Sequence, residues 1–175
     1  AHRRIIDVDS HLIELDDFLH NAASPEHLDL VPSMLEQKGL PVVKAGLDRG
    51  RELFEKRQND PSSMAKFEAS LMDNTKNGWS RLGAFDPKER SHTLDLLGFE
   101  MQWVLPTFSF HQTLAAAKGE ALEATSITLN KAMANFCAHD DRLKAVGYLP
   151  LNLGPETAKA IMDEGFAQGC YTFLL

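Results

Sequence analysis

The sequence predicts an α/β fold in which parallel strands alternate with helices. Short apolar runs rich in strand-forming residues occur at 5–13, 101–106, 143–151 and 170–175, and amphipathic helical segments separate the later ones. Strands that alternate with helices favour a parallel sheet with right-handed crossovers. The 175 residues are the length of one domain and can bury a sizeable core.

The first strand is expected at IIDVDSHLI, residues 5–13, where β-branched residues and strict alternation coincide. Alternation places Asp7, Asp9 and His11 on one face of this strand. The other face carries Ile6, Val8, Ser10 and Leu12. We therefore expect a buried strand.

Weaker signals follow, and residues 16–80 are expected to form a helical insertion with loops after the first strand. Prolines interrupt this stretch at positions 25, 32, 41 and 61. Its clearest helical part is 45–57, where Leu47, Leu53 and Phe54 suggest one apolar face.

Capping signals define the next helix. Asp86 supplies an N-cap oxygen, Pro87 takes the first helical position and Glu89 completes a capping box. The helix should end at Leu97, because Gly98 can adopt the left-handed conformation that stops it. The strand at 101–106 then follows.

The remaining elements alternate in the same way. An amphipathic helix is predicted over 120–138, the third strand over 143–151, and another helix from Pro155 to Gly165. The last apolar run, 170–175, is the fourth strand.

Composition excludes several classes of function. The formal charge is −7 and the basic residues form no stripe, so nucleic acid is not an expected partner. No apolar run reaches the roughly 18 residues of a membrane span, and no signal peptide is recognisable. Cys137 and Cys170 are expected to be reduced thiols of a cytoplasmic protein. Phosphate-loop, nucleophile-elbow and Cys-x-x-Cys motifs are absent.

Asp9 and His11 are the candidate metal ligands. Positions i and i+2 of a strand share a face, with Cα atoms about 6.5 Å apart, so a carboxylate and an imidazole here can reach one ion. A catalytic zinc site needs three protein ligands and one open position. The pair is therefore either part of a metal site or merely a polar strand face.

The run IIDVDSHLIE, residues 5–14, resembles the first strand of the amidohydrolase superfamily. The similarity is to the amidohydrolase-related branch, which includes aminocarboxymuconate-semialdehyde decarboxylase and the resorcylate-type decarboxylases; there an Asp, Glu or His stands two residues before a ligand His. It continues in order through WSRLGAFDPKERSHTLDLLGFEMQWVLPT (79–107), NKAMANFCAHDDRLKAVGYLPL (130–151) and GFAQGCYTFLL (165–175).

This resemblance implies the N-terminal part of a (β/α)8 TIM barrel, with about four parallel strands and the helical insertion after the first. A whole barrel takes about 250 residues. Asp9 and His11 would be the first two ligands of a divalent metal, zinc by preference and manganese as the alternative. The other ligands and the general base would lie beyond Leu175. In the family a proline often follows the glutamate, whereas Leu15 follows Glu14 here, so Glu14 receives no role.

Three functions remain open. The leading one is a metal-dependent hydrolase acting on a small carboxylated or cyclic substrate, in which the ion lowers the pKa of its water towards about 7 and polarises the carbonyl. The first alternative is a nonoxidative, metal-dependent decarboxylase. The second is a non-catalytic half-barrel that serves as a binding or assembly module. The expected partners are a small-molecule substrate and, as a homo-oligomer, further copies of the chain.

Three further residues are candidates for substrate binding. Phe108 and His111 follow the second strand in PTFSFHQ, and barrel enzymes bind substrate with the loops at the carboxyl ends of their strands. Asn152 follows the third strand in the same way. The alternatives are that Phe108 packs the loop, that His111 is a surface histidine and that Asn152 stabilises a turn. The segment 139–142 lies at the opposite end of a strand and is expected to serve stability.

Overall fold

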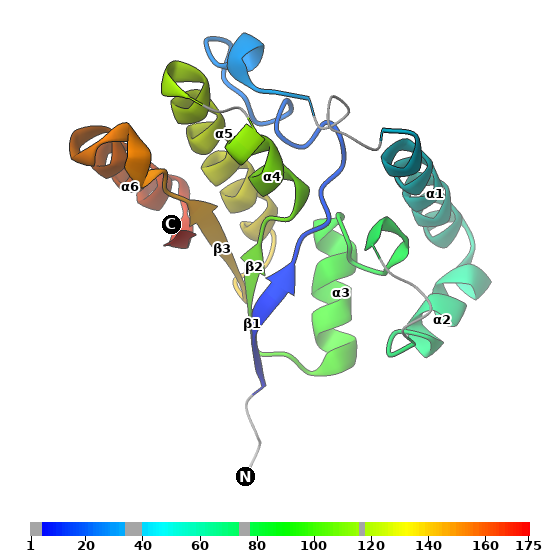
Figure 1. The fold of residues 1–175 in the computed structure, drawn as a ribbon. Helices are drawn as coiled ribbons and strands as arrows, with labels where there is room; N and C mark the ends of the chain where they lie inside the picture. The colour runs from blue at the N-terminus through cyan, green and yellow to red at the C-terminus, as the bar shows by residue number, and fades with distance from the viewer. Residues whose placement is uncertain (1–4, 34–39, 74–77, 116–117) are drawn as a thin grey trace.

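A four-stranded, all-parallel sheet organises the chain. In the computed structural model, residues 5–33, 40–73, 78–115 and 118–175 are described. The strand order follows the sequence, and Figure 1 shows β1, β2 and β3 pointing the same way. The strands are β1 (Ile6–His11), β2 (Met101–Leu105), β3 (Leu143–Tyr148) and β4 (Cys170–Leu174). The predicted α/β class and parallel sheet are confirmed, and the arrangement is compatible with part of an α/β barrel.

Helices provide the crossovers between strands, as expected. α3 (Pro87–Leu97) precedes β2, α5 (Gly119–Cys137) precedes β3, and α6 (Pro155–Gln168) precedes β4. α5 packs on β3, and α6 packs on α5. Single 3-10 turns occupy Leu28–Leu30, Gly78–Ser80 and Leu151–Leu153. No helix in the described part of the chain combines the length and apolarity needed to cross a bilayer.

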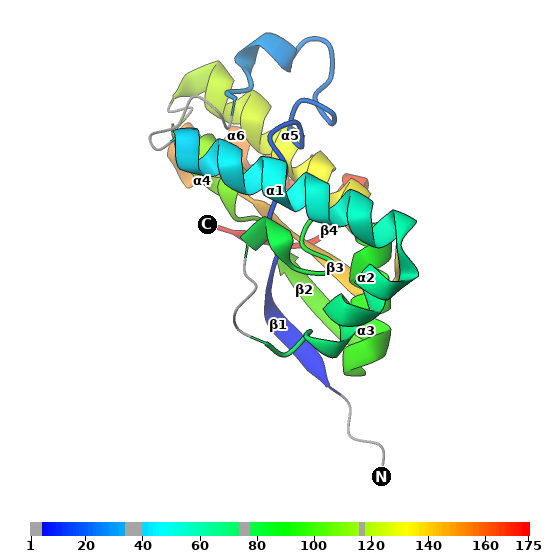
Figure 2. The same cartoon turned by 90° about the vertical axis from the view of Figure 1, so that its right-hand side faces the viewer.

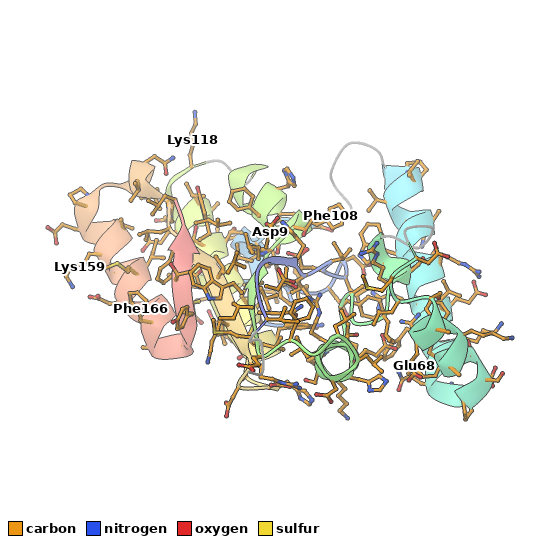
Figure 3. The ribbon with its side chains drawn as sticks, turned by 90° about the horizontal axis from the view of Figure 1, so that it is seen from below. Asp9, Glu68, Phe108, Lys118, Lys159 and Phe166 are labelled. Atoms are coloured by element: carbon orange, nitrogen blue, oxygen red, sulfur yellow. The ribbon has the colours of Figure 1, made fainter. Side chains whose placement is uncertain are left out.

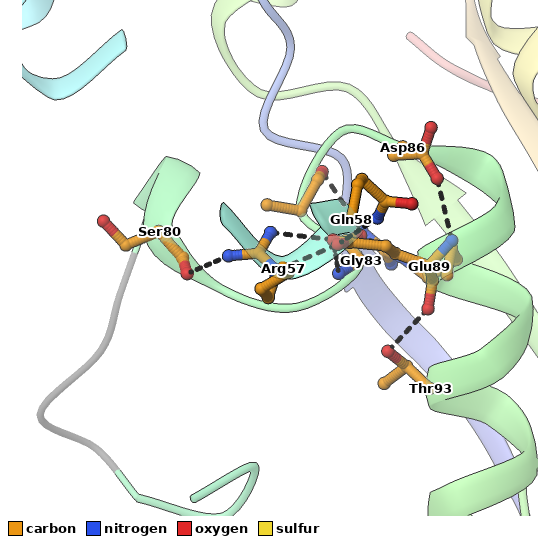
Figure 4. A network of polar contacts seen from close by, with 9 residues as sticks. Arg57, Gln58, Ser80, Gly83, Asp86, Glu89 and Thr93 are labelled. Carbon is orange, nitrogen blue, oxygen red and sulfur yellow. Dashed lines mark hydrogen bonds and ion pairs between the residues drawn. The ribbon is translucent and has the colours of Figure 1, made fainter. Parts of the chain in front are cut away.

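The segment after β1 contains the expected helical insertion. α1 (Leu40–Asn59) is longer than the predicted 45–57, and α2 (Pro61–Ala69) follows it directly. Both lie beyond the open edge of β1 (Figures 1 and 2). A polar network around Arg57 and Glu89 joins α1 to α3 (Figure 4).

The predicted boundaries of α3 are confirmed. The Asp86 side chain accepts a hydrogen bond of 2.8 Å from the Glu89 amide, which satisfies one of the free N–H groups of the first turn. Gly98 ends the helix with φ 70°, in the left-handed region.

The expectation that β1 is a buried strand is wrong, since Ser10 is its one buried residue. Ile6 is 49% exposed and Val8 is 58% exposed, because β1 is the edge strand of the described sheet. A bulge lies between Asp7 and Ser10, which pair with Gln102 and Val104 of β2. The extra residue shifts the alternation, and Ser10 and Leu12 are the buried residues of this stretch.

Other elements also differ from expectation. β3 ends at Tyr148, before the expected end at Leu151. The segment after β2 is a helix, α4 (Phe108–Ala115), where the sequence suggested a loop. α6 continues through Gly165 to Gln168 and ends at Gly169, which has φ 114°. Gly165 therefore lies inside the helix. It is a glycine because the Phe173 ring packs against it, and a Cβ there would come within 2.7 Å of the ring.

The main core lies between the sheet and the helices that cover it. Leu94 of α3, Val104 of β2, and Leu129 and Met133 of α5 are all fully buried there. The segment after β1 adds Leu12 and Leu19 to the same core. The core therefore holds the carboxyl ends of β1 and β2 in fixed positions.

Candidate metal centre

The Asp9 and His11 side chains meet at the carboxyl end of β1 (Asp9 is labelled in Figure 3). Asp9 Oδ1 lies 3.6 Å from His11 Nε2, which is too long for a hydrogen bond. Two donors bound to one tetrahedral zinc ion at about 2.1 Å lie about 3.4 Å apart. Both side chains are open to solvent, with 85% of Asp9 and 47% of His11 exposed. Their spacing fits two ligands of one ion.

The bulge in β1 is held by Asp7. Its Oδ1 accepts the Asp9 amide at 3.0 Å, and its Oδ2 accepts the side-chain amide of Gln102 at 3.2 Å. Asp7 was expected on the same face as Asp9 and His11, but it is tied instead to Gln102 of β2. It therefore fixes the backbone from which Asp9 projects.

His11 is held from two sides. Its Nδ1 lies 3.0 Å from Thr107 Oγ1, just after β2. Its backbone carbonyl accepts a hydrogen bond of 2.9 Å from Arg90 Nη2. Arg90 also donates to Ser10 Oγ and to the Gly83 carbonyl, both at 2.6 Å. If Nδ1 donates to Thr107, Nε2 is the nitrogen that can bind a metal.

Arg90 is a buried cation that joins three segments of the chain. It is 6% exposed, and burial lowers its pKa to about 10, so it stays protonated at neutral pH. The acceptors of its hydrogen bonds are carbonyl and hydroxyl oxygens, from the strand β1 and the turn before α3. It therefore fixes the end of β1 against α3.

Glu14 is fully buried three residues after His11. Its carboxylate accepts the backbone N–H groups of Thr107 and Phe108, each at 2.8 Å. Burial raises the pKa of this carboxyl, while the hydrogen bonds from Ser109, Phe108 and Thr107 oppose that rise. Sequence analysis assigned Glu14 no role, and the structure makes it a link between the ends of β1 and β2.

The donor set near Asp9 is incomplete for a catalytic ion. Across residues 5–33, 40–73, 78–115 and 118–175, no group of three or more His, Cys, Asp or Glu side chains is placed to hold a metal. One carboxylate and one imidazole fit two of the three protein ligands that a catalytic zinc requires.

A cavity of about 720 Å³ borders the pair. It runs along β1 toward α2 and α3, and its lining includes Asp9, His11 and Arg90. Most of its wall is apolar, with Phe67 and Phe99 among the lining residues. A small molecule with an apolar body could therefore lie beside the two candidate ligands.

The three candidate substrate contacts lie after β2 and β3, as predicted. The Phe108 ring stacks on Trp79, with 4.7 Å between ring centroids and 12° between planes, so it joins α4 to the insertion. His111 is exposed on α4, and its ring meets the edge of Phe110. Asn152 is exposed in the turn Leu151–Leu153. Their contact with a substrate stays a prediction.

The turn at 139–142 holds an ion-pair cluster at the amino end of β3. Arg142 Nη2 lies 2.7 Å from Asp140 Oδ2, and Arg142 Nη1 lies 2.6 Å from Asp95 of α3. The hydrogen bonds from Arg142 lower the pKa of the Asp140 carboxyl well below its usual range. These contacts join α3 to β3, as a stabilising turn would.

Comparison with known proteins found no match, whether among protein-family models, curated proteins or solved structures.

Proposed function

We propose that this chain is the N-terminal part of a (β/α)8 barrel of the amidohydrolase superfamily and that it contributes two ligands of a divalent metal to a hydrolase. The observation that carries the proposal is the 3.6 Å separation of Asp9 Oδ1 and His11 Nε2 at the carboxyl end of a strand in a parallel sheet. Ligands of α/β proteins bind at that edge. Zinc suits a mixed carboxylate and imidazole set, and manganese is the alternative.

Each residue has a defined task in this proposal. Asp9 and His11 would hold the ion, with the remaining ligand and the general base contributed from beyond Leu175. When bound, a divalent ion supplies Lewis-acid polarisation of a substrate carbonyl or carboxylate and an acidified water. Thr107 and Arg90 keep His11 in place through its Nδ1 and its carbonyl oxygen. The cavity borders Asp9 and His11, so a small carboxylated or cyclic substrate that binds the ion would lie at that end of it.

Turnover by the native protein tests this proposal. Purified protein, loaded with Zn²⁺ or Mn²⁺, is assayed against a panel of small amides, lactones and hydroxybenzoate carboxylates. We expect metal-dependent hydrolysis that falls at least a hundredfold in Asp9→Ala and His11→Ala. His139→Ala is the control, because His139 is exposed at the other end of the sheet. Release of carbon dioxide in place of hydrolysis products would favour the decarboxylase. Turnover that is unchanged in both Asp9→Ala and His11→Ala would contradict the hydrolase and the decarboxylase proposals alike.

The edge of β1 favours a second candidate, the half-barrel binding or assembly module. Ile6 and Val8 are exposed apolar residues on an edge strand, and such an edge invites pairing with another strand. The intact mass of the native gene product separates the cases. A mass well above that of 175 residues supports the enzyme, whereas a mass equal to it, with a homo-oligomer in solution, supports the module.

A further inference from the structure

Glu14 caps a helix that is distant in sequence. Its Oε1 accepts the Thr107 amide and its Oε2 accepts the Phe108 amide, and the Ser109 hydroxyl donates to Oε1. These groups begin α4, whose first N–H groups have no partner within the helix. A carboxylate at this position also interacts favourably with the helix dipole.

This cap leaves the Thr107 hydroxyl available for His11. Thr107 stands immediately before α4, at the position where a threonine oxygen ordinarily accepts an N–H of its own helix. Here Thr107 Oγ1 lies 3.0 Å from His11 Nδ1 instead, while Glu14 accepts the helix amides. Glu14 follows His11 by three residues and contacts Thr107, which in turn contacts the His11 ring.

We propose that Glu14 is a positioning residue that sets the tautomer and the orientation of the His11 ring through Thr107. A proton on Nδ1, donated to Thr107 Oγ1, leaves Nε2 unprotonated and facing Asp9 Oδ1 at 3.6 Å. Partners of this kind fix the orientation of metal-binding histidines, and losing one typically costs 10–100-fold in metal affinity. Only this consequence for metal affinity rests on the proposed function, since the tautomer belongs to the metal-free protein.

The direct test is ¹⁵N NMR of the His11 ring in metal-free native protein, at a pH where the imidazole is neutral. The signal is assigned by its loss in His11→Asn. In the wild type we expect the proton on Nδ1. Thr107→Val should move it to Nε2, the nitrogen that free histidine favours, and Thr107→Ser should keep it on Nδ1.

Glu14→Gln tests the longer link. Glutamine offers one acceptor oxygen in place of two, so the Thr107 and Phe108 amides cannot both keep their partners, and we expect a mixture of tautomers. Asp86→Ala is the matched control: it removes the cap of α3, which does not contact His11, and should leave the tautomer unchanged while lowering stability.

Three results would overturn the proposal. The first is a wild type whose His11 proton lies on Nε2. The second is an unchanged Nδ1 proton in Thr107→Val. The third is a Glu14→Gln protein that loses stability as Asp86→Ala does, with the wild-type tautomer retained. A protein that shows the expected tautomers but binds no Zn²⁺ supports the positioning role and contradicts the proposed function, so the two failures are distinguishable. With Zn²⁺, Thr107→Val should bind 10–100-fold more weakly than the wild type.

Discussion

Arg57 and Glu89 form a doubly hydrogen-bonded ion pair in the interior, with Nε–Oε1 and Nη2–Oε2 distances of 2.8 Å (Figure 4). The side chains are 0% and 3% exposed. Glu89 also accepts the Gly83 amide and the Gln58 side chain, each at 3.1 Å. The pair therefore connects the helical insertion to α3 and to the turn that Arg90 contacts.

Removing one partner of this pair should be costly. Arg57→Ala leaves the Glu89 carboxylate buried without its cation, and we expect a loss of about 3–5 kcal/mol in the free energy of unfolding. The double variant Arg57→Met/Glu89→Leu removes both charges and should lose less stability than Arg57→Ala. Urea denaturation measures all of these, and a loss below about 1 kcal/mol in Arg57→Ala would contradict the assignment.

Arg90→Lys should destabilise the protein although it keeps the charge. A lysine donates from a single nitrogen, whereas the planar guanidinium of Arg90 donates from three nitrogens to Ser10, Gly83 and His11. At least one buried acceptor then loses its donor, at a cost of about 1–3 kcal/mol. Chemical denaturation checks the value. Arg49→Lys, at an exposed position of α1, is the control and should change stability by less than about 0.5 kcal/mol.

The two thiols should make the protein less stable at high pH. Burial raises the pKa of Cys137 and of Cys170 to about 12, from about 9 in an unfolded chain. Their stabilising contribution is complete below pH 9 and is lost as the pH rises toward 12, because the unfolded state releases these protons first. The free energy of unfolding should change little between pH 7 and pH 9 and should fall between pH 9 and pH 10.5, and Cys137→Ala/Cys170→Ala should show a smaller fall. If the free energy of unfolding fell equally in that variant, groups other than the two thiols would be responsible for the loss of stability.

Local signals predicted the elements whose ends are encoded nearby. α3 is the clearest case, because Asp86 caps it within three residues and Gly98 ends it. α4 escaped prediction because a carboxylate 94 residues away caps it, and its first turn contains aromatic residues with modest helix propensity. Gly165 was misinterpreted as a helix end because its reason for being glycine is contact with Phe173.

The candidate site was predictable only in its two proposed ligands. Spacing alone placed Asp9 and His11 together, and the structure keeps them together although a bulge interrupts the alternation. Thr107 and Arg90 could not be identified from the sequence, because each acts on β1 from a distant position. Glu14 is close to His11 in sequence, but its partners, the amides of Thr107 and Phe108, are distant. The burial of β1 was misjudged because alternation cannot indicate which strand lies at the edge of a sheet.

The most direct measurement is the affinity of the native protein for Zn²⁺ and Co²⁺, by calorimetry and by the visible absorption of bound Co²⁺. Wild type, Asp9→Ala, His11→Ala and His139→Ala are compared. We expect one metal per site in the wild type and in His139→Ala, with binding weakened at least tenfold in Asp9→Ala and in His11→Ala. Absence of binding in the wild type, or equal binding in His11→Ala, would contradict the metal centre.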